Sequence, residues 1–175
     1  MIVARYAAFL RGVNVGGRIV KMADLRACLE KAGLENVTTL LQSGNVIFES
    51  AVALPELKRL IEVILTETFN YPAKVQVMSI ETLRSIVDNY PFGEAGDNQH
   101  DYVIFLEDNL EDELLNEPYD LTPGEQVKAG KGVVYWRVDR GLTLKSNFAK
   151  QFAKAKYKNF NTNRNLKTLR KILAI

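Results

Sequence analysis

A glycine-rich segment near the start of the chain has the composition of an anion-binding loop. Residues 11–17 read RGVNVGG and follow an apolar stretch that is typical of a β-strand. Glycines let backbone N–H groups turn toward an anion, and the first turn of a following helix adds a favourable dipole. The spacing matches neither the dinucleotide-binding fingerprint nor the Walker loop, so a tight strand-to-helix turn is the alternative. The candidate ligand-binding residues here are Arg11, Asn14, Gly16, Gly17 and Lys21.

A second polar cluster, Gln42 to Asn45 (QSGN), lies between two stretches that are typical of strands. A Gly-Asn pair suits a tight hairpin because both residues tolerate positive φ. A hairpin turn is therefore the simplest interpretation. Ser43 and Asn45 remain candidate ligand-binding residues, because their side chains can both donate and accept hydrogen bonds at the tip of such a hairpin.

A third polar cluster, 161–165 (NTNRN), precedes an apolar helical pattern and is typical of a helix cap. Thr162, Arg164 and Asn165 are candidate site residues, since an arginine beside a helix cap can receive an oxyanion or a phosphate. Arg164, Lys167 and Lys171 have the spacing of one basic helical stripe.

We expect Arg11 and Arg164 to share one concave pocket, because an anion between two guanidinium groups relieves their repulsion. Asn14, Asn45 and Asn165 would lie at the rim of that pocket.

The elements that would position these clusters follow a ferredoxin-like order in the first half of the chain. Apolar periodicity predicts strands over 3–10, 37–42, 46–49 and 74–78, and helices over 22–32 and 54–69. This is the βαββαβ order of the split βαβ plan. We therefore predict an α+β protein of two tandem ferredoxin-like (βαββαβ-type) halves, 1–78 and 79–175, each with an antiparallel sheet packed by helices.

The second half is predicted to have the order βαββα, with helices at both ends. Ser79 can cap its first helix, and Asp108 with Glu111 suggests a capping box that opens a short acidic helix. The predicted strands are 102–106, 126–129 and 133–138, and the predicted later helices are 147–157 and 166–173.

The charges are segregated along the chain. Residues 88–125 hold twelve acidic residues and no Lys or Arg, whereas 145–175 hold nine basic residues and no Asp or Glu. The two regions could attract each other within one chain or between chains, so a homo-oligomer is possible. The basic region could instead meet an anionic partner such as nucleic acid.

Composition excludes several classes of protein. The single cysteine, Cys28, excludes an internal disulfide framework and, with His100 as the only histidine, any Cys- or His-rich metal site. The longest uncharged stretch has 13 residues, which is too short for a membrane helix. With no signal peptide recognised, we expect a soluble cytoplasmic protein without metal or cofactor. His100, beside Asp101, remains a possible catalytic base, but no nucleophile–base signature is present.

Four phrases of the sequence, taken together, resemble a bacterial family known as domain of unknown function 1697. They are YAAFLRGVNVGG (6–17), MADL (22–25), QSGN (42–45) and TNRN (162–165), and the resemblance covers essentially the whole chain. It implies two ferredoxin-like halves and assigns the three polar clusters to one family signature. Leu40 and Leu166 depart from the family, which usually has tyrosine and tryptophan at these positions.

Three functions are compatible with these features. The first is a binding module for an anionic ligand, such as a nucleotide, a nucleic acid or a phosphorylated or carboxylated metabolite. The second is a small cofactor-independent enzyme acting on such a substrate, with no catalytic residue assigned. The third is an interaction protein that uses its acidic and basic regions. The aromatic pattern of an RNA-recognition motif is absent.

Overall fold

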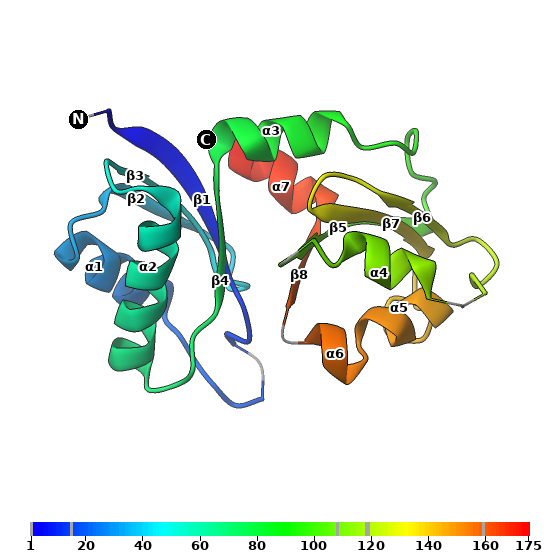
Figure 1. The fold of residues 1–175 in the computed structure, drawn as a ribbon, viewed down its shortest axis with the longest axis horizontal. Coiled ribbons are helices and arrows are strands. Elements are labelled where there is room, and N and C mark those ends of the chain that lie inside the picture. Colours follow the sequence, from blue (N-terminus) through cyan, green and yellow to red (C-terminus); the bar gives the residue numbers. More distant parts are fainter. Residues whose placement is uncertain (1, 15, 108, 118–119, 159) are drawn as a thin grey trace. The chain divides into compact units, whose positions relative to one another are not determined.

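The chain divides into two compact units, which we call unit 1 (residues 1–83) and unit 2 (residues 84–175). The boundary falls inside helix α3 (Ile80–Asp88), the helix that was expected to open the second half. Each unit has one four-stranded antiparallel sheet covered by helices, which confirms the predicted α+β class (Figure 1). The computed structural model describes residues 2–14, 16–107, 109–117, 120–158 and 160–175.

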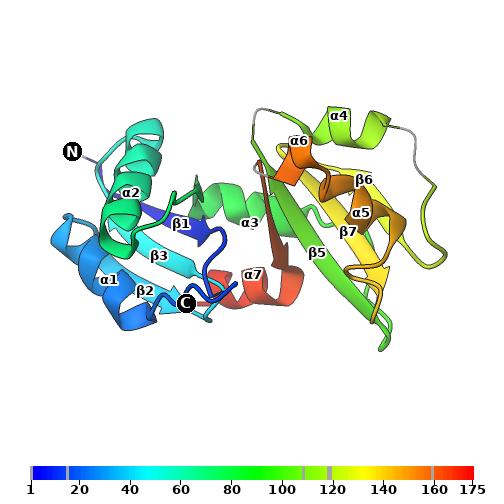
Figure 2. The same cartoon turned by 90° about the horizontal axis from the view of Figure 1, so that it is seen from below.

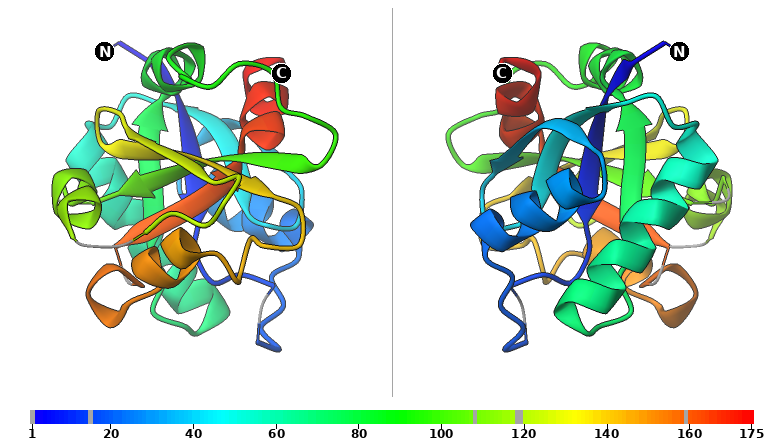
Figure 3. Two further views of the ribbon diagram at one scale, coloured as in Figure 1. Left: turned by 90° about the vertical axis from the view of Figure 1, so that its right-hand side faces the viewer. Right: turned by 90° about the vertical axis from the view of Figure 1, so that its left-hand side faces the viewer.

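Unit 1 has the predicted βαββαβ order. Its elements are β1 (Ala4–Leu10), α1 (Met22–Lys31), β2 (Glu35–Leu40), β3 (Asn45–Ser50), α2 (Leu54–Phe69) and β4 (Val75–Ser79). The strands lie in the order β2-β3-β1-β4, and each neighbouring pair is antiparallel, as in the ferredoxin-like plan. The right panel of Figure 3 shows α1 and α2 together over one face of this sheet.

Aliphatic side chains fill the space between this sheet and its helices. In α2, Leu57, Ile61 and Leu65 recur every four residues, so they project from one face of the helix, and all three are fully buried. Leu25 and Leu29 form the matching face of α1. This packing holds the end of β1 and the start of α1 in place, and those two ends anchor the glycine-rich loop.

Unit 2 repeats the same order with shorter helices. Its elements after α3 are β5 (Gln99–Leu106), α4 (Glu111–Asn116), β6 (Gln126–Ala129), β7 (Val133–Asp139), α5 (Asn147–Phe152), α6 (Ala155–Lys158), β8 (Asn161–Asn165) and α7 (Leu166–Leu173). The strand order β6-β7-β5-β8 corresponds position by position to that of unit 1. The prediction of βαββα was therefore one strand short.

The strand missing from the prediction is β8, the polar segment that was interpreted as a helix cap. It pairs antiparallel with β5, with Thr162 opposite Phe105 and Asn165 opposite Tyr102. A strand needs only backbone N–H and C=O groups to pair, so side chains as polar as NTNRN can occupy the edge of a sheet. Because these side chains have no hydrophobic alternation, the sequence contained no strand signal.

The single helix predicted over 147–157 is two short helices. α5 ends at Phe152 and α6 begins at Ala155. The side-chain amide of Asn161 donates to the carbonyls of Phe152 (3.2 Å) and Tyr157 (2.8 Å). These bonds satisfy carbonyl groups that an interrupted helix leaves without intrahelical partners. Among the described helices, none is both long enough and apolar enough to cross a membrane.

The start of α4 also differs from the expectation. Asp108, the first residue of the predicted capping box, lies outside the described residues. The helix begins at Glu111, and its N-cap, Leu110, makes no side-chain cap hydrogen bond. Glu111 instead accepts a hydrogen bond from the backbone N–H of Gly132 (3.2 Å), which links α4 to the turn between β6 and β7.

Candidate functional site

The side chain of Asn14 fixes the shape of the glycine-rich loop. Its Nδ2 donates to the carbonyls of Val20 (3.3 Å) and Gln42, and its Oδ1 accepts a hydrogen bond from the N–H of Val20 (2.9 Å). Asn14 has φ +54°, a left-handed conformation that asparagine tolerates better than most residues. The side chain thus closes the loop on itself and ties it to the neighbouring hairpin.

The turn between β2 and β3 packs against this loop. Asn45 is fully buried, and its Nδ2 donates to a backbone carbonyl (2.8 Å) and to Ser43 Oγ (2.9 Å). Gly44 has φ +81°, and a Cβ atom at this position would lie 2.8 Å from both Leu10 Cβ and Val13 Cγ2. The structure therefore brings the first two polar clusters together. The contacts of Ser43 and Asn45 are those of a hairpin turn, and their role in ligand binding stays a prediction.

The tip of the loop exposes its backbone and its cations. Gly16 and Gly17 have φ +59° and +82°, and a Cβ atom on either would meet nothing within 4 Å. Lys21 is exposed at the N-cap of α1 and makes no side-chain cap hydrogen bond. The Arg18 guanidinium lies 4.4 Å above the centre of the Tyr71 ring, which holds this charge against the folded unit.

The third polar cluster has two structural roles. Asn165 caps α7, because its Oδ1 accepts a hydrogen bond from the N–H of Lys167 (2.9 Å). Thr162 is buried and Arg164 is half-buried, both on β8. Because Arg164 is on a strand, it does not share a helical face with Lys167 and Lys171. The predicted basic stripe is therefore wrong.

The two arginines of the predicted pocket belong to different units. Arg11 follows β1, and its backbone N–H donates to the carbonyl of Lys74 (3.1 Å). Arg164 Nη1 donates to the carbonyl of Asn163 (2.9 Å), and burial lowers the pKa of the Arg164 guanidinium to about 10. Their meeting in one pocket stays a prediction.

Unit 2 contains a cleft of about 910 Å³ that no motif had indicated. The end of α3, the loop that follows it, the start of β5, Arg140 and the first turns of α7 line the cleft. Its acidic and basic lining residues are Asp88, Glu94, Asp97, Asp101, Arg140, Lys167 and Arg170. Of the residues considered from the sequence, Asn165, His100 and Asp101 also lie here. The charged residues of the cleft come from distant segments of the sequence. They therefore form no local pattern from which the cleft could be predicted.

An aromatic and ion-paired wall bounds the cleft. Arg137 makes two bonds to Asp101, Nε to Oδ1 at 2.7 Å and Nη2 to Oδ2 at 3.0 Å, and this carboxylate raises the pKa of Arg137. The side chains of this pair are only 8% and 13% exposed. Tyr90 packs edge-on against Phe92, with ring centres 5.5 Å apart. The Tyr90 hydroxyl is buried and makes no hydrogen bond within the described part of the chain, and burial raises its pKa.

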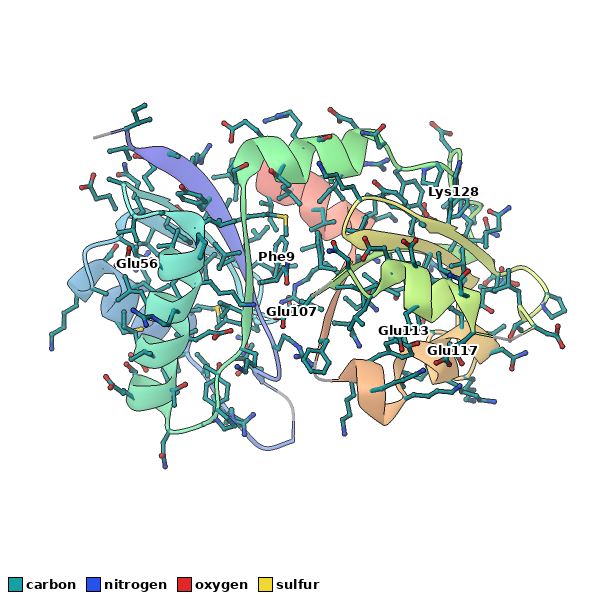
Figure 4. All side chains as sticks on the ribbon, in the orientation of Figure 1. Phe9, Glu56, Glu107, Glu113, Glu117 and Lys128 are labelled. Carbon is teal, nitrogen blue, oxygen red and sulfur yellow. The ribbon has the colours of Figure 1, made fainter. Side chains whose placement is uncertain are left out.

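Part of the basic C-terminal region is neutralised within unit 2. Lys154 lies 3.2 Å from a Glu117 carboxylate oxygen, and Lys156 lies 3.4 Å from one of Glu113. Figure 4 shows Glu113 and Glu117 beside the α5–α6 segment. These pairs are the attraction within one chain that the segregated charges suggested. The three basic residues of α7, Lys167, Arg170 and Lys171, make no ion pair in the described structure.

Comparison with known proteins places the chain in a family. The sequence pattern of the family described as "Protein of unknown function (DUF1697)" matches residues 3–135. Among solved structures, the conserved bacterial protein SP0830 from Streptococcus pneumoniae is 27% identical, with a TM-score of 0.84 over 99% of this chain and 98% of that one. An unknown protein from Galdieria sulphuraria is 8% identical, with a TM-score of only 0.29 over 94% of this chain and 98% of that one. None of the curated proteins matches. With three quarters of its length matched and both polar clusters of unit 1 inside the match, the chain belongs to the DUF1697 family.

Proposed function

We propose that the protein is a binding module for a compact anion, a phosphate or carboxylate group of a small molecule, held at the glycine-rich loop of unit 1. The observation that carries this proposal is the contrast within the loop. Hydrogen bonds from Asn14 tie the base of the loop to Val20 and Gln42, while Gly16 and Gly17 at its tip are exposed. A loop whose base is already tied down loses less entropy when it binds an anion than a free loop does.

The charges around the loop favour the same ligand class. Lys21 and Arg11 flank the glycines, and the first turn of α1 has no side-chain cap to satisfy its N–H groups. The binding residues proposed in unit 1 are Arg11, Asn14, Gly16, Gly17, Lys21, Ser43 and Asn45. A polyanion such as RNA has less support than a small molecule, because Lys154 and Lys156 of the basic region pair with Glu113 and Glu117.

Titration calorimetry with pyrophosphate and a nucleoside triphosphate tests this proposal. Lys21→Gln is the informative variant, because Lys21 is exposed and its loss does not disturb the core. Loss of one charge-assisted contact should weaken binding about tenfold, or about 1.4 kcal/mol. Lys31→Gln, at the opposite end of the same helix and equally exposed, is the matched control and should bind as the parent does.

Two results would overturn the proposal. One is that neither pyrophosphate nor the nucleoside triphosphate binds at concentrations up to about 10 mM. The other is an equal loss of affinity in Lys21→Gln and Lys31→Gln, which would indicate a diffuse effect of net charge. A short RNA that bound more tightly than both small probes would instead favour a nucleic-acid function.

A further inference from the structure

The cleft of unit 2 has two poles of opposite charge at the ends of two helices. α3 ends at Asp88, and no basic residue lies in its last turn. α7 begins at Leu166 with Lys167 as its second residue, and no acidic residue lies in its first turn. Asp88, Leu166 and Lys167 all line the cleft.

Both side-chain charges have the sign that each helix dipole disfavours. The carboxyl end of a helix is partly negative and is stabilised by cations, yet α3 ends in an aspartate. The amino end is partly positive and is stabilised by anions, yet α7 begins with a lysine, and Arg170 follows one turn later. Such violations of a local rule cost stability and are expected where a protein uses the resulting field.

Within the described residues, the charges that line the cleft are not neutralised by each other. Neither Asp88 nor Glu94 forms an ion pair there, and Arg140, Lys167 and Arg170 form none. Asp101 is the exception, since Arg137 neutralises it. A purely anionic ligand would meet the carboxylates, and a purely cationic one would meet Lys167 and Arg170. A ligand with both charges matches both poles.

We propose that this cleft binds a small zwitterion of the amino-acid or dipeptide type, with its carboxylate at Lys167 and Arg170 and its ammonium group at Asp88. The rings of Tyr90 and Phe92 take the carbon skeleton, because both line the cleft and pack edge-on against each other. The volume of about 910 Å³ accommodates a dipeptide.

Calorimetric titration of the full chain with the dipeptide glycyl-phenylalanine and two blocked forms tests the proposal. The N-acetylated form lacks the ammonium group, and the C-amidated form lacks the carboxylate. Each blocked form should bind about tenfold more weakly than the free dipeptide. Equal affinity of all three forms, or no heat of binding from the free dipeptide up to about 10 mM, would refute the proposal.

Two variants assign the poles. Asp88→Asn should bind the free and N-acetylated dipeptides alike. Arg170→Gln, which leaves Lys167 in place, should reduce the difference in affinity between the free and amidated dipeptides. Both residues are exposed, so the fold is expected to tolerate these changes. Glu81→Gln on α3 and Lys171→Gln on α7 are matched controls, because they are exposed on the same helices and do not line the cleft.

The inference is separate from the anion site proposed for unit 1. Lys21→Gln should leave the weaker binding of the N-acetylated form unchanged, because an anion site does not recognise the ammonium group. If Glu81→Gln and Lys171→Gln lost the difference in affinity between free and blocked dipeptides as Asp88→Asn and Arg170→Gln do, the two poles would not be the binding groups. The proposal would then be wrong.

Discussion

The helices that connect the strands of unit 1 have 10 and 16 residues, whereas those that connect the strands of unit 2 have six, six and four, and the eight-residue α7 follows its last strand (Figure 2). The strand order and pairing directions are nevertheless the same in both. A shorter helix buries fewer side chains, so unit 2 has to obtain its core from larger ones.

The cores differ accordingly. Unit 1 is packed mainly with Leu, Ile and Val, whereas unit 2 is built around Trp136, whose ring lies 5.2 Å from that of Phe152 and 5.1 Å from that of Tyr102. Large aromatic side chains carry polar atoms that must be satisfied when they are buried. Trp136 Nε1 accordingly donates to the buried Glu125 (2.8 Å). One topology is thus compatible with an aliphatic core or with an aromatic core whose polar atoms are bonded to carboxylates.

The hairpin turns of the two units are also equivalent. At the end of β1 the N–H of Leu10 donates to the carbonyl of Gly44 (2.8 Å), and at the end of β5 the N–H of Leu106 donates to that of Gly132 (3.1 Å). Both glycines have positive φ, but only Gly44 is packed against side chains. In unit 1 the close packing therefore falls on Gly44, whereas in unit 2 it falls on Gly130, where a Cβ atom would lie 2.6 Å from Tyr135 Cε2, and the space around Gly132 is open.

The largest effect is expected for Trp136→Ala, which should lower the free energy of unfolding by about 3–5 kcal/mol, measured by urea denaturation. Trp136→Phe should cost about 1–3 kcal/mol, because it keeps an aromatic ring but leaves Glu125 without the indole N–H. A loss below about 1 kcal/mol for Trp136→Ala would show that unit 2 does not depend on its aromatic core.

A smaller effect is expected at the paired turns. Gly44→Ala should destabilise the protein by about 2–4 kcal/mol, since its Cβ would clash with Leu10 and Val13 and its φ is left-handed. Gly132→Ala should cost only about 1 kcal/mol, because the backbone is strained but the space is empty. Equal melting temperatures for the two variants would contradict the difference between the turns.

The helix caps that follow the fourth strand of each unit should contribute about equally to the free energy of unfolding. Ser79 Oγ accepts a hydrogen bond from the N–H of Thr82 (3.1 Å), and Asn165 Oδ1 accepts one from that of Lys167 (2.9 Å). Ser79→Ala and Asn165→Ala should each lower the free energy of unfolding by about 1 kcal/mol. Aspartate at either position should restore most of the loss, and chemical denaturation would show whether it does.

The last effect is expected only in strongly alkaline solution. Burial raises the pKa of Tyr90, Tyr135 and Tyr157 in unit 2, and of Tyr71 in unit 1. Above about pH 10 the unfolded chain loses these protons while the folded chain keeps them, so stability should fall as the pH rises. The ultraviolet absorbance of tyrosinate in the folded protein should therefore rise at a higher pH than that of free tyrosine. Titration at the same pH as free tyrosine in the folded state would contradict this.

Much of the fold could be predicted from the sequence, because the buried face of a helix or strand appears as apolar residues at a regular spacing. The helix predicted over 54–69 has those bounds in the structure, and Ser79 caps the next helix as expected. The hairpin around 130–132 and the helix over 166–173 also agree. Each of these elements has an apolar face or a turn residue whose effect is local, so neighbouring residues suffice to identify it.

The candidate sites could be predicted only in part. The glycine-rich loop and the QSGN turn were recognised from residue type, but the bond from Asn14 to Gln42 that joins them spans 28 residues. The cleft of unit 2 was not recognised at all, because Asp88, Arg140 and Lys167 come from three distant segments. No local pattern records that their elements meet.

The sequence by itself determined the α+β class, most of the elements, the family signature and the segregation of charge, because each depends on residue type or on spacing within one element. Tertiary structure alone decided that 161–165 is a strand. The edge of β5 supplies the backbone hydrogen-bond partners, and the polar side chains of this segment show no strand pattern. It also decided which charges are neutralised and which line a cleft. Coulomb interaction depends on distance in space, and residues as far apart in sequence as 88 and 167 acquire that distance only when the chain folds.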